Sequence, residues 1–313
     1  MKQRAESAPK RSNTVLYLLA IGVVVVSGFF ALEQLAATRS EALLGLVAGE
    51  AARVEDVLER IGEKAAVVSG DEGLAADFAS WQWQPGSDNG KTLAAVRERV
   101  GELLGEPDSE LLGFSRYDQE GGILFRAGRR FPLDLSPPPR ISTDVGWSVK
   151  GPFRNGSEQF LLVEVPVIGG DGVRVGTDQL LASMDPLQEI VRVFREARKE
   201  EELILGTSRE KVSEIFFDVR REGDVARVDL NVGLALASCS EGSSGLIWPD
   251  RGAGAGDTVA YRALESAPWG VVVRAPGSAY PKPGLFSVFT SLYFWAGLLV
   301  AAGLIGWSMR RAI

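Results

Sequence analysis

Histidine is absent from the 313 residues, and cysteine occurs once, at Cys239. The lack of histidine removes the usual base of a catalytic triad, the commonest metal ligand and any phosphate-accepting imidazole. A single cysteine excludes an intramolecular disulfide and a cysteine-based zinc site. Any folded region must therefore be stabilised by its core, for which a hydrophobic content of 45% is sufficient.

Basic residues are in the minority, because 41 Asp and Glu outnumber 34 Lys and Arg and give a formal net charge of −7. Nucleic-acid binding needs a basic surface, so this balance argues against a nucleic-acid partner. The sequence also lacks a spaced calcium-binding loop, a recognisable pair of catalytic carboxylates and a serine–lysine motif. We therefore expect no enzyme activity, no cofactor and no resident metal.

Charge is missing altogether from two stretches, residues 15–32 and residues 285–307, which contain 18 and 23 residues. As helices they would be roughly 27 and 34 Å long, against a bilayer hydrocarbon core of about 30 Å. The sequence therefore predicts a transmembrane helix in each stretch. A cleaved signal peptide is the alternative for the first stretch, but its uncharged run is longer than the usual signal-peptide core.

The flanks of these stretches predict their orientation. Residues 1–14 carry four Lys or Arg and one Glu, and residues 308–313 carry two Arg. Basic residues near the membrane ends favour the cytoplasmic side. We expect both termini in the cytoplasm, residues 33–284 outside it, and contact with membrane lipid along the two helices.

Residues 33–69 contain no proline and continue the first uncharged stretch as a predicted long helix. Apolar residues recur along it at alternating spacings of four and three, forming a heptad seam: Val47, Ala51, Val54, Leu58, Ile61, Ala65 and Val68. Such a seam pairs with the same helix of a second protomer or packs on its own domain. Both interpretations stay open, and the first predicts a homodimer.

Strand and turn signals then recur in two blocks, residues 70–184 and residues 185–284. Strands are predicted in the first block at 110–117, 123–127, 146–150, 159–168 and up to about 181, and in the second block at 212–220, 226–232, 258–264 and 269–275. Asp185 and Pro186 predict the start of a helix between the two sets of strands. Antiparallel strands combined with helices in this way indicate an α+β fold.

Two stretches carry a resemblance to a known family. One runs from Phe160 to Val167 and is followed by a Gly-Asp-Gly turn, a strand and the helix that opens at Asp185. The other joins residues 259–264 to residues 268–274 as a closing hairpin. With the order of elements along the chain, they resemble the double Cache family of extracytoplasmic bacterial sensors. The resemblance implies a long N-terminal helix followed by two PAS-like antiparallel-sheet modules, flanked by two transmembrane helices.

The resemblance implies a ligand-sensing module of a bacterial signal-transduction receptor in the inner (plasma) membrane. Residues 70–184 would form the membrane-distal module and residues 185–284 the membrane-proximal one. The module would bind a small molecule and pass a conformational signal across the membrane. Family members usually continue into a cytoplasmic signalling region, so a separate cytoplasmic signalling protein is the expected output partner here. The alternative is an envelope structural or interaction protein that uses a Cache-like fold to bind a partner protein.

Six residues of the distal module are candidate ligand contacts: Arg126, Arg140, Trp147, Tyr117, Phe153 and Asp178. Arginine suits bidentate carboxylate recognition, so Arg126 or Arg140 predicts a small anionic ligand, with the aromatic residues as its apolar wall. Asp178 lies near an aspartate that the family places on the last strand. Trp147 is followed by Ser148, where the amino-acid-binding members have tyrosine, so an amino-acid ligand is not expected. The alternative is a solvated basic surface above core aromatics.

Overall fold

The computed structural model describes residues 11–75, 89–105, 110–129, 146–155, 158–169, 172–209, 212–217, 230–249, 256–277 and 279–280. The chain divides into two compact units. One unit contains residues 46–247 and 259–274, and the other contains residues 1–45, 248–258 and 275–313. The first unit holds most of both sheets and all of the sites discussed below.

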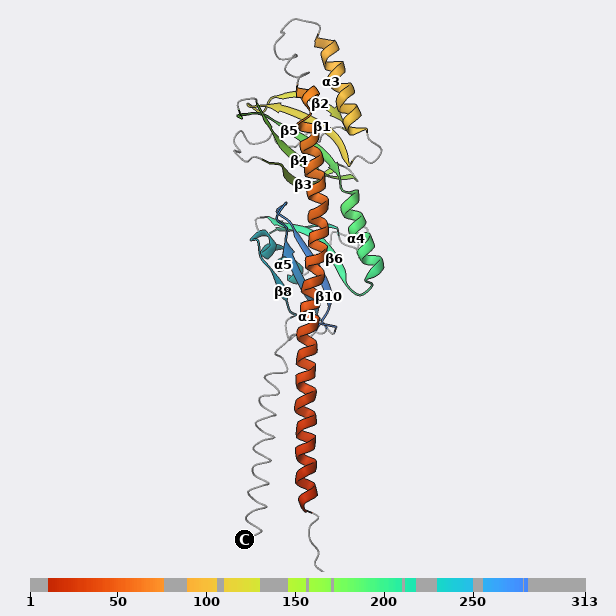
Figure 1. Cartoon of the computed structure of the whole chain (residues 1–313), viewed down its shortest axis with the longest axis vertical. Coiled ribbons are helices and arrows are strands. Elements are labelled where there is room, and N and C mark those ends of the chain that lie inside the picture. The colour runs from red at the N-terminus through yellow and green to blue at the C-terminus, as the bar shows by residue number, and fades with distance from the viewer. Residues whose placement is uncertain are drawn as a thin grey trace, which may run out of the picture. The chain divides into compact units, whose positions relative to one another are not determined.

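Helix α1 runs from Arg11 to Ser69 and is 59 residues long, which confirms the predicted long N-terminal helix (Figure 1). All seven residues of the heptad seam, from Val47 to Val68, are buried within the chain. The seam therefore packs on its own domain. It does not offer a free surface to a second protomer, so the homodimer loses the feature that predicted it.

Two five-stranded sheets follow α1, as the α+β prediction required. The first sheet is antiparallel throughout and has the order β2 (Ile123–Gly128), β1 (Leu111–Asp118), β5 (Arg174–Ser183), β4 (Glu158–Ile168) and β3 (Ser148–Asn155). The second has the order β7 (Val212–Phe217), β6 (Glu202–Arg209), β10 (Gly270–Pro276), β9 (Asp257–Ala263) and β8 (Ser244–Ile247). In each sheet the central strand is the last one along the chain, which gives both modules the same strand order.

The described fold also contains the helices α3 (Asn89–Leu104), α4 (Asp185–Ala197) and α5 (Leu230–Ser240). Helix α4 is strongly amphipathic and buries Leu187, Ile190, Val191 and Phe194. It joins the last strand of the first sheet to the first strand of the second, as Figure 1 shows.

Helix α5 corrects the strand predicted at residues 226–232, because Leu230 to Val232 begin a helix. Alternating apolar and polar residues predict a strand at 226–232. However, Val232 and Leu236 are four residues apart, which is also the spacing of one helical turn. Helix α5 packs against the second sheet, where Val232, Ala235 and Leu236 join a buried cluster with Ile204, Val259 and Val272. Tertiary packing selected the helix over the locally ambiguous pattern.

Two glycines allow α5 to lie close to this sheet. A Cβ atom at Gly206 would stand 2.9 Å from Cδ1 of Leu236, and one at Gly270 would stand 2.6 Å from Sγ of Cys239. These residues are cross-strand partners on β6 and β10. The face of the second sheet under α5 is therefore filled by side chains from the helix.

Within the part of the chain that the structure describes, no helix has both the length and the apolarity that crossing a membrane requires. This finding does not support the transmembrane helix predicted at residues 15–32, which form part of α1. The second predicted span, residues 285–307, lies outside the described residues.

Candidate functional site

The first sheet has two chemically different faces, which are set by the alternation of side chains along each strand. Ser69 of α1 donates a hydrogen bond from Oγ to Oδ2 of Asp178, at 2.5 Å. The face that carries Asp178 on β5 therefore meets the helix. Gln179, the next residue of β5, points to the opposite face.

A row of side chains crosses this opposite face from one edge of the sheet to the other. Cross-strand pairing aligns five residues in the order of the strands: Arg126 on β2, Ser115 on β1, Gln179 on β5, Glu164 on β4 and Ser148 on β3. We call these five residues the polar row. Every member is polar or charged, although β1 and β5, which carry the central members, are mostly buried.

Hydrogen bonds join neighbouring members of the polar row. Gln179 donates from Nε2 to Oε1 of Glu164 at 3.0 Å, and Arg126 donates from Nε to Oγ of Ser115 at 3.3 Å. Arg126 also donates from its NH2 group to the Tyr117 hydroxyl at 3.2 Å. Lys150 of β3 forms an ion pair with Oε2 of Glu164 at 2.5 Å. Arg126 thus stands at one end of the row and the Glu164 carboxylate next to the other end, with the neutral groups of Ser115 and Gln179 between them.

The centre of the row is shielded from solvent. Ser115 and Gln179 are 0% exposed, and Tyr117 is 2% exposed. Oε1 of Gln179 accepts no hydrogen bond from any residue that the structure describes. Buried polar atoms are nearly always paired, because leaving one unpaired costs about 1–3 kcal/mol. This carbonyl oxygen could therefore accept a hydrogen bond from a bound molecule.

Apolar side chains border the polar row. Phe160, Leu162 and Leu181 form a buried cluster on the same face, and Phe153 and Leu112 pack against it. The rings of Phe153 and Phe160 are stacked with their centroids 6.0 Å apart. The arrangement places an apolar wall beside a line of hydrogen-bonding groups, which is the usual composition of a small-molecule site.

The other face of the sheet contains a buried ion pair instead. Arg116 donates to Asp178 through Nε and through its NH2 group, at 2.6 Å in each case, and both side chains are almost fully buried. Burial raises the pKa of the Asp178 carboxyl, while hydrogen bonds from Arg116 and Ser69 act in the opposite direction. Arg116 also donates to the Ser69 carbonyl oxygen at 3.3 Å. This group fastens the end of α1 to the sheet.

The structure brings together two of the six residues proposed from the sequence, Arg126 and Tyr117, whereas Phe153 lies on the opposite edge strand of the sheet. Arg126 and Tyr117 are hydrogen-bonded, and Phe153 lies in the apolar cluster of the same face. Asp178 is enclosed in the ion pair on the opposite face. Trp147 also packs on α1, since a Cβ atom at Gly62 would lie 2.2 Å from its ring. Arg140 lies outside the described residues.

Sequence reasoning missed Ser115, Gln179 and Glu164. Their signal was present, because each is a polar residue next to apolar residues of a predicted strand. Local sequence could not show that the three positions align across β1, β5 and β4, since β1 and β5 are separated by more than fifty residues. That alignment needs the register of the sheet.

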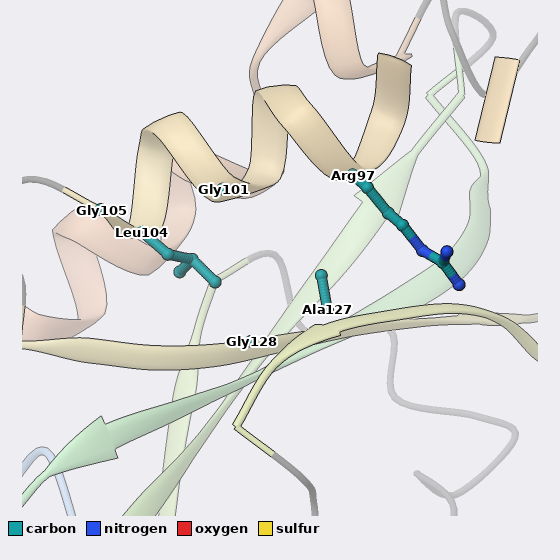
Figure 2. Close-up of a pocket in the computed structure, with 6 residues that line it drawn as sticks. All are labelled: Arg97, Gly101, Leu104, Gly105, Ala127 and Gly128. Carbon is teal, nitrogen blue, oxygen red and sulfur yellow. The ribbon is translucent and has the colours of Figure 1, made fainter. Parts of the chain in front are cut away.

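A separate cavity of about 400 Å³ lies between α3 and β2 and is shown in Figure 2. It is lined by Arg97, Gly101, Leu104, Gly105, Ala127 and Gly128. Only Arg97 contributes a polar side chain, and no member of the polar row takes part. This cavity lacks convergent polar groups and is the weaker candidate for specific binding.

In the described ranges, no group of three acidic, histidine or cysteine side chains is placed so that it could hold a metal ion. The second sheet also offers no counterpart of the polar row, because its equivalent face is occupied by α5. The polar row is therefore the best candidate site in the described part of the chain.

No protein-family profile and no curated protein matches the sequence. Solved structures do match. The periplasmic sensory domain of the Campylobacter jejuni chemoreceptor Tlp1 is similar with a TM-score of 0.55 and 12% identity, over 80% of this chain and 99% of that one. The ligand-binding domain of Campylobacter jejuni Tlp3 in complex with L-valine gives 0.53 and 11%, over 80% and 97%. The Tlp3 sensory domain with isoleucine bound gives 0.53 and 12%, over 80% and 97%.

These similarities extend over whole sensory domains, and they confirm the long N-terminal helix and the two antiparallel-sheet modules expected from the double Cache resemblance. At this level of identity they establish the fold alone. The site must be argued from the residues of this chain.

Proposed function

We propose that this chain, which has the fold of double Cache sensory domains, is the extracytoplasmic ligand-sensing module of a bacterial signal-transduction receptor. The polar row would be its binding site, and the ligand a small molecule. The observation that carries the proposal is the buried Oε1 of Gln179, which receives no donor from the described residues and lies in the row between Arg126 and Glu164.

The site chemistry favours a ligand with at least one anionic group. Arg126 is held at the edge of the row by Ser115 and Tyr117, in a position from which its guanidinium could pair with a carboxylate. Leu181 of the apolar cluster, two residues from Gln179 on β5, would contact the non-polar part of the molecule. The similarity to chemoreceptor domains solved with valine and isoleucine supports a ligand of comparable size.

The signal would leave the module through a change in packing. A ligand moves such an equilibrium only by binding one arrangement more tightly than the other. Gln179 of the polar row and Asp178 of the ion pair are consecutive residues on β5, so a shift of this strand on binding reaches α1 through Ser69. The uncharged stretches at either end of the sequence would carry the change across the membrane.

The test is a thermal-shift screen of the purified full-length chain with small carboxylates, followed by calorimetry of any hit. A ligand at a hundred times its Kd stabilises by about 2.7 kcal/mol, which corresponds to roughly 5–11 °C in a domain of this size. Q179L and R126M should each reduce the affinity at least tenfold.

The matched control is R129M, which removes an arginine whose exposed ion pair with Glu158 lies in the same sheet but outside the polar row. It should bind as the unmodified chain does. A ligand whose affinity is unchanged in both Q179L and R126M would show that the polar row is not the binding site.

The alternative of an envelope interaction protein gains no support from these contacts. A heptad seam combined with the lack of a usable pocket would favour this alternative, and the seam is buried within the chain.

A further inference from the structure

The tip of the hairpin between β9 and β10 contacts the first sheet through a buried hydrogen bond. The indole Nε1 of Trp269 donates to the carbonyl oxygen of Gly151 at 3.1 Å. Trp269 is only 2% exposed and immediately precedes β10, while Gly151 belongs to β3. One directional bond thus connects the edge strand of the first sheet to the residue that precedes the central strand of the second.

The same hairpin tip is also held by α1. Oε1 of Glu55 accepts hydrogen bonds from the backbone N–H groups of Glu265 and Ser266, and its Oε2 accepts from the Ser266 hydroxyl. Three donors converge on one carboxylate, and bonds to an ionised acceptor are stronger than neutral ones. The hairpin tip is therefore bonded to the long helix through Glu265 and Ser266 and to the first sheet through Trp269.

Trp269 is well placed to respond to a movement of β3. Its ring packs edge-on against Phe216, with the centroids 5.2 Å apart. Beside it, the carbonyl oxygen of Pro268 accepts a hydrogen bond from Oγ1 of Thr207. A densely packed aromatic side chain with a fixed hydrogen bond cannot absorb a displacement by rotating freely. Displacement of the Gly151 carbonyl must move the ring or break the bond.

The residue before Gly151 is Lys150, whose ammonium group is paired with Glu164 of the polar row. Glu164 in turn accepts from Gln179. The connection from the proposed ligand site to the hairpin tip therefore has four consecutive steps: the Gln179 amide, the Glu164 carboxylate, the Lys150 side chain and backbone, and the Gly151 carbonyl bonded to Trp269.

We propose that the Trp269–Gly151 bond is the contact through which the polar row of the first sheet controls the position of the β9–β10 hairpin. A ligand in the row that binds Gln179 and Glu164 changes the ion pair between Glu164 and Lys150. This change shifts β3 relative to α1. Glu55 fixes the hairpin tip to α1, and Trp269 bonds it to β3. A movement of β3 relative to α1 therefore displaces the hairpin. Strand β10 is followed in the sequence by the second uncharged stretch, which gives the displacement a route onward.

This inference rests on the proposed function only in taking a ligand as the molecule that occupies the polar row. The connection between the row and Trp269 is testable without a ligand. The probe is the indole N–H of Trp269 in the full chain, labelled with 15N-indole tryptophan and observed by NMR. The chain contains seven tryptophans, and the W269F spectrum identifies the resonance of interest by its loss. Two variants perturb the ion pair between Lys150 and Glu164. K150M removes the positive charge of Lys150, and E164Q removes the negative charge of Glu164 while conserving the shape of the side chain.

Both variants should move the Trp269 resonance and speed its hydrogen exchange by about threefold to tenfold, the effect of weakening one buried hydrogen bond. R129M breaks an exposed ion pair of the same sheet and should leave the resonance and its exchange unchanged. Use of the isosteric E164Q keeps the test decisive if K150M fails to fold.

An unchanged Trp269 resonance in both K150M and E164Q would overturn the proposal, as would an equal change in R129M. Failure here would leave the ligand-binding results for Q179L and R126M untouched. Conversely, a chain that binds no ligand could still show the coupling. The two hypotheses are therefore decided by separate measurements.

Discussion

Replacing Arg116 by methionine should leave the Asp178 carboxylate buried without its counter-charge. The pair is joined by two bonds of 2.6 Å, and the two side chains are only 6% and 0% exposed. Removing one partner of such a pair costs about 3–5 kcal/mol, mainly because the remaining charge stays desolvated. For a domain of this size, each kcal/mol lowers the melting temperature by about 2–4 °C. We therefore expect R116M to melt about 6–20 °C lower at neutral pH.

The loss in R116M should depend on pH in a defined direction. Burial raises the pKa of Asp178, and the variant lacks the arginine that opposes this effect. A carboxyl whose pKa is higher in the folded than in the unfolded protein binds its proton more tightly when folded. The destabilisation is then fully present above the folded-state pKa and declines as the pH falls toward the unfolded value. The deficit of R116M should be larger at about pH 8 than at about pH 5.

Thermal denaturation of the full chain, followed by circular dichroism across this pH range, measures both effects. The double variant R116M/D178L removes both charges, and replacing a buried pair by apolar residues is often nearly neutral, so it should recover most of the lost stability. R129M supplies the control for loss of a solvent-exposed arginine. A deficit below about 1 kcal/mol in R116M, the same deficit at every pH, or a double variant as unstable as the single one would refute the reasoning.

Two further predictions concern close packing and thiol burial. G62A should destabilise the chain by about 1–3 kcal/mol, because its Cβ would stand 2.2 Å from the Trp147 ring. Denaturant titration of G62A, W147A and the double variant should show that the losses of stability are not additive. Additive losses would contradict the contact between the two residues. Burial raises the pKa of the Cys239 thiol to about 12, so a thiol reagent such as DTNB at about pH 8 should label it only after unfolding. Because the thiolate is disfavoured in the folded state, stability should also decrease once the pH rises above about 8.5, the ordinary thiol pKa. Rapid labelling of the folded chain would show that Cys239 is accessible.

The polar row illustrates what sequence reasoning can and cannot reach. The sequence proposes Arg126 as an arginine that could pair with an anion and Tyr117 as part of an apolar wall, and the structure joins them by a hydrogen bond. Asp178 was selected by position on its strand, and its side chain turned out to face α1. The difference of one residue between Asp178 and Gln179 decides which face of the sheet each side chain occupies.

The sequence by itself determined the elements whose causes are local. Seven seam positions spaced four and three apart specified a helix with one buried face, and alternating apolar residues specified most of the strands. The absence of histidine and of a second cysteine excluded whole classes of chemistry. These features follow from the spacing of residues along the chain, so they do not depend on distant contacts.

Only the tertiary structure decided what depends on residues far apart in the sequence. It assigned the α1 seam to the chain's own domain, made a helix of residues 230–240 and aligned Ser115, Gln179 and Glu164 in one row. It also brought Gly151 to the Trp269 indole across more than a hundred residues. In each case, burial and sheet register select among alternatives that local propensity leaves nearly equal in free energy.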